Sequence, residues 1–149
     1  MQKIKLGDLT NDEIIKVLSG LPLEDMKDNY PNFNGWWQQK VIPDMLIGNR
    51  NGILYYKNDI LDGISIVKPS EDKICLLRTF GNFKGEKLSY EIFKDSIEIL
   101  EVEKPYFTIS DTNIEKYRKQ MKYFGFEIMD FETDRYINGK TEYFINNVE

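Results

Sequence analysis

Two lysines and a glycine follow an apolar stretch in the middle of the chain, in a pattern that can bind a negatively charged group. The apolar stretch runs from Ile74 to Thr79, and the turn after it holds Lys84, Gly85 and Lys87. An amphipathic helix is expected to begin there, and a helix start offers unpaired backbone N–H groups and the positive end of the helix dipole. Such a strand, turn and helix can hold a phosphate or pyrophosphate. The pattern therefore predicts a nucleotide-like or coenzyme ligand.

The absence of histidine limits the catalytic chemistry open to the chain. None of the 149 residues is His, and Cys75 is the one cysteine. Ser-His-Asp triads, Cys-His pairs, His-ligated zinc and cysteine-cluster metal sites are therefore excluded, and we expect no bound metal. A general acid or base has to be a carboxylate, Tyr, Lys, Cys, the N-terminus or water. The reaction is then expected to be undemanding, or to use a cofactor that is already activated.

Composition predicts an ordinary soluble globular protein. Apolar residues make up 41% and charged residues 30% of the chain, and its length suits a single domain, residues 1–149. The formal net charge of −5 argues against a nucleic-acid partner, which requires a basic face. No apolar run approaches the roughly 20 residues of a membrane span, and the N-terminus lacks the apolar core of a signal peptide. We therefore expect a cytoplasmic protein with no membrane partner.

Hydrophobic spacing and turn residues predict the element order β-α-α-β-β-β-α-β-α-β-β. This order favours a mixed α/β fold with a mostly antiparallel central sheet and helices on both faces. Residues 21–35 are expected to form a loop. Strands are expected at residues 4–6, 52–56, 60–67, 74–79, 106–110, 126–131 and 142–145, and helices at 10–20, 36–42, 87–100 and 112–125.

Caps and turns are expected at the ends of these elements. Thr10 and Thr112 are each followed three residues later by Glu, which predicts a capping box at the start of the first and last helices. Pro43 is expected to end the second helix. Asn58-Asp59 signals a hairpin, and Asn138-Gly139 suits a type I′ turn between the last two strands.

The run Leu77-Arg78-Thr79-Phe80-Gly81-Asn82-Phe83-Lys84-Gly85-Glu86-Lys87-Leu88-Ser89 resembles, without a gap, the segment L-x-V-x-P-x-Y-R-G-x-G-I-G of the GNAT superfamily of acetyl-CoA-dependent acyltransferases. Phe83, Lys84 and Gly85 take the positions of the family's aromatic residue, arginine and glycine. The element order from about residue 53 to residue 145 is also that of the family. Gly125-Phe126 matches its G-F pair, and Gly63 lies where its second meander strand usually has a glycine.

The resemblance implies an N-acetyltransferase that moves an acetyl group from acetyl-CoA, or a related acyl-CoA, to a primary amine of a small molecule or protein. In that family a strand edge pairs with the pantetheine arm, turn amides wrap the pyrophosphate, and the acyl group reaches the amine between two splayed parallel strands. Small proteins of that family often pair, so the resemblance allows a homodimer, while the sequence itself leaves the oligomeric state open. The implied coenzyme-binding residues are Leu77, Thr79, Lys84, Gly85, Glu86, Lys87, Leu88, Ser89 and Asn113.

Several positions depart from the family pattern. Lys87 and Ser89 replace its two key glycines, and a Cβ there crowds an approaching phosphate. The Lys87 ammonium could pair with phosphate or fill the site, and Lys84 and Lys87 could equally be solvated turn residues. Met121 replaces the tyrosine that protonates the departing thiolate, and Tyr117 stands one turn earlier. An alternative is therefore a GNAT-fold module that has lost catalysis and acts by binding.

Candidate catalytic groups follow from residue type. Tyr117 is the candidate acid, although a core position explains it more simply, and Glu71 is the candidate base. Asp72 and Glu142 are further carboxylates of the right type, and a solvated surface position would explain each of them. A toxin acting on charged tRNA is disfavoured, because the acidic balance of the chain offers no readable basic patch.

Overall fold

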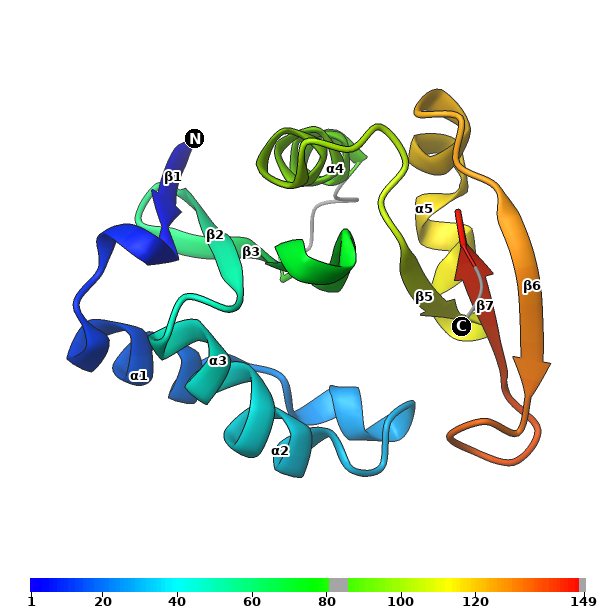
Figure 1. Ribbon diagram of the computed structural model, residues 1–149, viewed down its shortest axis with the longest axis horizontal. Coiled ribbons are helices and arrows are strands. Elements are labelled where there is room, and N and C mark those ends of the chain that lie inside the picture. Colours follow the sequence, from blue (N-terminus) through cyan, green and yellow to red (C-terminus); the bar gives the residue numbers. More distant parts are fainter. Residues whose placement is uncertain (81–85, 148–149) are drawn as a thin grey trace.

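Two antiparallel sheets lie side by side in the computed structural model, which describes residues 1–80 and 86–147 (Figure 1). The larger sheet has the order β1-β2-β3-β4 and the smaller one the order β5-β7-β6. Their strands are β1 (Gln2–Lys5), β2 (Asn51–Lys57), β3 (Ile60–Lys68), β4 (Lys73–Thr79), β5 (Phe107–Ser110), β6 (Ile128–Thr133) and β7 (Thr141–Ile145).

A single parallel bridge between Lys73 and Tyr106 joins the two sheets in the described residues. The Ile74 N–H donates to the Tyr106 carbonyl, and the Tyr106 N–H donates to the Asp72 carbonyl, each at 2.9 Å. The predicted mixed, mostly antiparallel sheet and its element order are confirmed.

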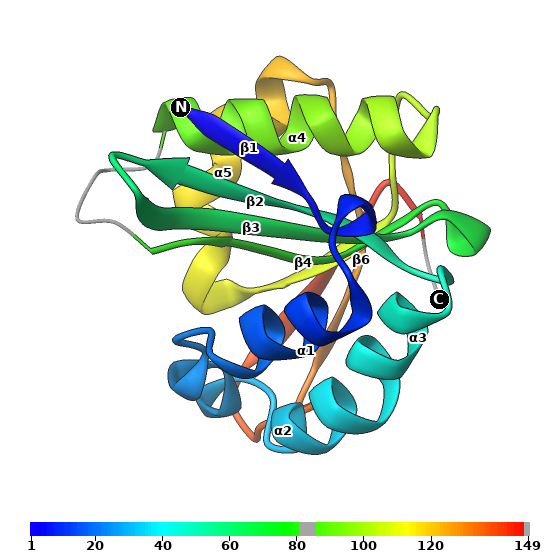
Figure 2. The same cartoon turned by 90° about the vertical axis from the view of Figure 1, so that its left-hand side faces the viewer.

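Helices cover both faces of the larger sheet (Figure 2). On one face lie α1 (Asn11–Ser19), α2 (Phe33–Trp36) and α3 (Ile42–Leu46), and on the other lies α4 (Glu86–Leu100), followed along the chain by α5 (Asp111–Tyr123). Within the described residues no helix is long and apolar enough to cross a membrane.

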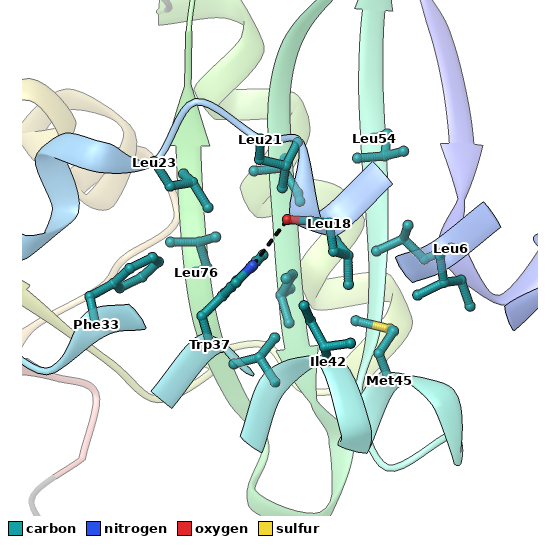
Figure 3. Packing of buried hydrophobic residues seen from close by; sticks show 14 residues of the cluster. Leu6, Leu18, Leu21, Leu23, Phe33, Trp37, Ile42, Met45, Leu54 and Leu76 are labelled. Atoms are coloured by element: carbon teal, nitrogen blue, oxygen red, sulfur yellow. Dashed lines mark hydrogen bonds between the residues drawn. The ribbon is translucent and has the colours of Figure 1, made fainter. Parts of the chain in front are cut away.

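Trp37 lies at the centre of the core beneath α1–α3 (Figure 3). Its side chain is 4% exposed, and its indole Nε1–H donates to the Leu18 carbonyl at 3.0 Å. Leu54, Ile64 and Leu76 of the sheet pack into the same cluster. This packing fixes the helical layer on the sheet, because burial of apolar surface is the main source of stability.

Gly63 on β3 allows α4 to approach the opposite face of the sheet closely. A Cβ at this position would lie 2.9 Å from Leu88 Cδ2 and 3.0 Å from the Arg78 carbonyl oxygen. Gly63 pairs with Thr79 across the β3–β4 ladder, so the first turn of α4 lies beside the end of β4. The glycine that the family resemblance matched at this position is therefore explained by close helix–sheet packing.

Gly63→Ala is expected to lower the free energy of unfolding by about 1–3 kcal/mol, because the added methyl group overpacks the helix–sheet contact. Urea unfolding followed by circular dichroism measures this. Gly7→Ala is the matched control, since its nearest contact would be 3.8 Å away at the Asn51 side chain, and we expect a change within about 0.5 kcal/mol. Equal stability of the two variants would contradict the packing role of Gly63.

The caps and turns of the first half are partly as predicted. The capping box of Thr10 and Glu13 is present. Asn58 and Asp59 both adopt positive φ, 53° and 64°, which confirms a tight hairpin turn. The expected loop at 21–35 instead contains a 3₁₀ helix (Glu24–Asp28) and the start of α2. The first strand begins at Gln2, and Leu6 already belongs to a 3₁₀ turn.

The prediction that Pro43 ends the second helix is wrong. Residues 33–46 are helical throughout, because a π-helical turn (Trp37–Val41) links α2 to α3. Pro43 stands in the first turn of α3. The π-helical turn shifts the hydrogen-bond register just before the residue that cannot donate, so the helical path continues past it.

Two predictions in the second half are also wrong. Ser110, not Thr112, is the N-cap of α5, because β5 leads directly into the helix. Only Gly139 of the Asn138-Gly139 pair has positive φ, 82°, so the turn is not type I′. The loop is longer, and the Asp134 N–H donates to the Lys140 carbonyl at 2.9 Å.

The end of α5 explains why β6 begins at Ile128, later than expected. Gly125 has a φ of 71°, and its N–H donates to the Lys122 carbonyl while the Phe126 N–H donates to the Met121 carbonyl. These bonds form a Schellman motif, which satisfies the last carbonyls of the helix. The G-F pair thus ends the helix and places Phe126 in the core.

Candidate active site

A β-bulge at Cys75 bends β4 away from β5. The ladder pairs Ile66 with Leu76 and Val67 with Ile74, so Cys75 is the extra residue on β4. Such a bulge bends the strand and increases its local twist. Because the bridge at Lys73 and Tyr106 holds only one end of the two strands together, they diverge beyond it.

The backbone of Leu77 and Thr79 faces this opening between β4 and β5. Arg78 pairs with Ile64 across the ladder, and the Phe80 N–H donates to the Asp62 carbonyl at 2.8 Å. In an antiparallel pair the hydrogen-bonding groups alternate along the strand, so the residues between these positions point their N–H and C=O groups to the other edge. That edge can pair with an extended ligand.

A cavity of about 650 Å³ lies at this opening between β4 and β5. One wall is formed by α4, β5 and α5, and the other by residues 26–36 and the turn between β6 and β7. The first wall includes Phe93, Phe107, Ile109, Asn113, Lys116 and Tyr117, and the second includes Met26, Tyr30, Phe33, Trp36, Arg135 and Tyr136. The volume is within the range of small-molecule sites.

Four of the predicted site residues line this one cavity: Leu77, Thr79, Asn113 and Tyr117. Glu71 does not lie with them. It ends a 3₁₀ helix (Pro69–Glu71) before β4, is half exposed, and forms an ion pair with Lys68 at 3.4 Å. In the described residues no group of three or more His, Cys, Asp or Glu side chains is placed to hold a metal ion.

The other predicted coenzyme residues belong to the segment before α4 and to its first turn. Lys84 and Gly85 lie outside the described residues. Glu86 begins α4, Lys87 is exposed, and Leu88 and Ser89 are 5% and 2% exposed. Leu88 anchors the turn on the sheet with Ile53, Tyr55 and Ile92. The first-turn N–H groups of α4 have no partner within the helix and can donate hydrogen bonds to an anion.

Tyr117 lies in the cavity as a buried, protonated phenol. Its side chain is 8% exposed and contacts Phe93 at a ring distance of 6.2 Å. Burial raises the pKa of Tyr117, while the Arg78 guanidinium and the Thr79 side chain act in the opposite direction. The phenol therefore holds its proton at neutral pH. Met121, one turn later, is 4% exposed in the apolar core.

Glu142 is a buried carboxyl group behind the second wall. It is 4% exposed and accepts a hydrogen bond from the Tyr30 hydroxyl at 2.8 Å. Burial raises the pKa of Glu142, while hydrogen bonds with Tyr30 and Thr108 and the charge of Arg135 partly offset the rise. Tyr30 and Thr108 both line the cavity, so they connect Glu142 to it. The sequence marks Glu142 as a candidate by residue type alone, and only the fold brings Tyr30 to it.

Comparison with known proteins supports the fold, although no protein-family model and no curated protein sequence matches the chain. The PaiA N-acetyltransferase of Thermoplasma acidophilum, crystallised with coenzyme A, has a TM-score of 0.64 at 13% identity over 97% of this chain and 98% of that one. A point mutant of the spermidine N-acetyltransferase SpeG of Vibrio cholerae has a TM-score of 0.62 at 12% identity over 97% and 93%.

A third match is a Bacillus anthracis protein assigned as a streptothricin acetyltransferase and crystallised with acetyl coenzyme A. It has a TM-score of 0.55 at 9% identity, and the match covers 65% of this chain but only 61% of that one. Further matches are described as acetyltransferases of the GNAT family. Together with the splayed strands and the element order, these similarities identify the fold: the chain has the fold of the GNAT acetyltransferases.

Proposed function

We propose that the protein transfers an acetyl group from acetyl-CoA to a primary amine. The observation that carries this proposal is the opening between β4 and β5, where the backbone edge of Leu77 and Thr79 borders a 650 Å³ cavity. The edge suits an extended amide-containing arm, and the first turn of α4 lies at its end to receive a pyrophosphate. Structures of the same fold hold coenzyme A or acetyl-CoA.

The buried Tyr117 hydroxyl and the half-buried Tyr30 hydroxyl supply the acid–base chemistry that the transfer needs. The amine nitrogen attacks the thioester carbonyl, a C–N bond forms, and the C–S bond breaks. Tyr117 gives its proton to the departing thiolate. Tyr30 accepts a proton from the amine and passes its own to Glu142. Because the thioester is already activated, this modest assistance suffices for a chain without histidine.

Direct binding tests the coenzyme step. Calorimetric titration with acetyl-CoA is expected to show one site per chain, and Lys87→Ala is expected to weaken it about tenfold by removing one charge-assisted contact to phosphate. Lys94→Ala is the matched control, because Lys94 is exposed on the same helix two turns away. The affinity of this variant for acetyl-CoA should be unchanged. If millimolar acetyl-CoA produces no heat of binding and no thermal stabilisation, the proposal is wrong.

The second candidate is a GNAT-fold binding module without catalysis. The burial of Met121 at the position of the family's acid favours it, as do Lys87 and Ser89 in place of the two glycines. Under this alternative the natural chain does not bind acetyl-CoA, and Lys87→Gly creates binding by removing the crowding side chain. Loss of existing binding in Lys87→Ala would instead support the enzyme.

Glu142→Gln is expected to lower kcat about tenfold, because the relay from the cavity through Tyr30 loses its final proton acceptor. In the natural protein the rate should fall as pH drops through the raised pKa of Glu142, where the carboxylate takes up its proton. The acid limb of the pH–kcat profile should therefore change in the variant. If the acid limb is unchanged in the variant, protonation of the acceptor amine alone explains that limb.

The same variant should unfold at a higher temperature above neutral pH. A carboxyl group whose pKa is raised in the folded state contributes stability at low pH and loses it as pH rises through that pKa. Gln keeps a hydrogen-bond acceptor for Tyr30 but cannot ionise. Scanning calorimetry at pH 5 and pH 8 would test this, and a lower melting temperature at pH 8 would contradict it.

A further inference from the structure

Four cationic side chains line the cavity, although the whole chain is negatively charged. Its lining residues, all from the described part of the chain, include Lys73, Arg78, Lys116 and Arg135, and none of them is Asp or Glu. Two of these cations are ion-paired, Arg78 with Asp25 and Arg135 with Glu132, and neither of these carboxylates is a lining residue. Acidic residues outnumber basic ones in the chain, 25 to 20. A concave site lined by one sign of charge concentrates ligands of the opposite sign. The site therefore favours an acceptor that carries a negative group.

Arg78 lies on the α1–α3 side of β4, across the sheet from the α4 turn where we propose that the pyrophosphate binds. Successive side chains of a strand point to opposite faces, and Leu76 packs with the α1–α3 core while Leu77 packs with α4. Arg78 shares the face of Leu76, and its Nη1 donates to Met26 Sδ at 2.8 Å. It is therefore on the side opposite the wall of Asn113 and Tyr117.

One N–H donor of Arg78 has only a weak hydrogen-bond acceptor, so it can bind a stronger acceptor from a ligand. The Arg78 side chain is 25% exposed, and its Nη2 pairs with Asp25, whose side chain is 56% exposed. The acceptor at Nη1 is the thioether of Met26, which also lines the cavity, and a thioether is a weak acceptor. A carboxylate would form a stronger, charge-assisted bond with the same donor.

Aromatic rings cover the rest of this wall. The rings of Tyr30 and Tyr136 meet edge to face at 5.0 Å, and the Arg135 guanidinium lies 5.3 Å from the Tyr136 ring centroid. Phe33 and Trp36 continue the wall, with ring centroids 5.7 Å apart. Aromatic rings pack well against apolar or aromatic groups, preferring edge-to-face or offset contacts. The wall therefore suits an acceptor with an aromatic or apolar skeleton.

Resting on the acetyl transfer proposed above, we propose that the acceptor is an amine that also carries a carboxylate on an aromatic or apolar skeleton, as an aromatic amino acid does. Arg78 binds the carboxylate, and the aromatic wall receives the skeleton. Polycationic acceptors are disfavoured, because the lining residues within the described ranges include no carboxylate to bind an ammonium group, and Lys73 and Lys116 line the cavity beside the ion-paired Arg78 and Arg135.

Binding measurements on the full chain test this acceptor class without requiring turnover. L-phenylalanine, phenethylamine and spermidine are titrated by calorimetry, with and without coenzyme A. Phenylalanine and phenethylamine differ only in the carboxylate. We expect phenylalanine to bind at least about tenfold more tightly than phenethylamine, the effect of one charge-assisted contact, and spermidine to bind weakest.

Three variants locate the contact. Arg78→Gln should weaken the binding of phenylalanine about tenfold and change the affinity for phenethylamine less than about twofold. Asp25→Asn should strengthen the binding of phenylalanine up to about fivefold, because the substitution removes the exposed carboxylate that competes for Arg78. Such a gain cannot come from misfolding. Arg118→Gln is the control, since Arg118 is half exposed on α5 and pairs with Glu115 outside the cavity.

The outcomes separate this inference from the proposed function. If acetyl-CoA binds but phenylalanine binds no better than phenethylamine or spermidine, or not at all, the acceptor class is overturned while acetyl transfer stands. If phenylalanine binds through Arg78 but acetyl-CoA does not bind, the function fails and the carboxylate site remains. Equal effects of Arg78→Gln on phenylalanine and phenethylamine would also overturn the inference.

Discussion

Tyr117→Phe is expected to lower kcat at least about 100-fold, the usual effect of removing a general acid. The phenol is buried in the cavity wall, and burial keeps its pKa raised, so it carries a proton to give to the thiolate at neutral pH. Phe fills the same volume and keeps the contact with Phe93. The affinity for acetyl-CoA should therefore change little while the chemical step slows.

Release of free thiol from acetyl-CoA, measured with an acceptor that supports turnover, gives kcat for this comparison. Tyr123→Phe is the matched control, because Tyr123 ends the same helix with its side chain 73% exposed and should give natural activity. A Tyr117→Phe protein with undiminished kcat would leave Tyr117 as a core residue only. In that case water would have to protonate the thiolate.

Trp37→Ala is expected to lower the free energy of unfolding by about 3–5 kcal/mol, a large fraction of the stability of a small domain. The indole is 4% exposed and stacks on Phe33 at a ring distance of 5.6 Å (Figure 3). Its removal leaves a cavity and also deprives the Leu18 carbonyl of its donor. Ligand binding should weaken as well, since α2 forms one wall of the site.

Urea unfolding with two companion variants separates these contributions. Trp37→Phe keeps part of the packing but cannot donate to Leu18, so its cost should be intermediate. Ile47→Ala, at a side chain that is 71% exposed just after α3, should change stability by less than about 0.5 kcal/mol. A Trp37→Ala loss below about 1 kcal/mol would show that the α1–α3 layer does not depend on this residue.

Local patterns predicted most of the secondary structure, and they failed where tertiary contacts determine the backbone. The Asn58-Asp59 turn and the Thr10–Glu13 capping box formed as expected, because both depend on residues that are close in sequence. The Pro43 and Thr112 predictions failed. A π-helical turn carries the helix through Pro43, and α5 begins at the end of β5 rather than at its own capping signal.

The bulge at Cys75 could not be predicted from the sequence. Residues 74–79 read as a regular apolar strand, yet the ladder with β3 skips one residue and opens the sheet. That opening depends on how two distant strands pair, which the residue types of β4 alone do not specify. The prediction that Leu77 and Thr79 border a ligand cavity therefore came from the family resemblance, not from periodicity.

The sequence by itself determined the order of elements, the mixed sheet, and a chemistry without histidine, because these follow from composition and from patterns a few residues long. Only the tertiary structure decided which side chains share the cavity. Tyr30 reaches Glu142 across 112 positions, and Arg78 reaches Met26 across 52. Such partners have no common sequence signal, because the free energy of their contact comes from packing in the folded chain rather than from local conformational preference.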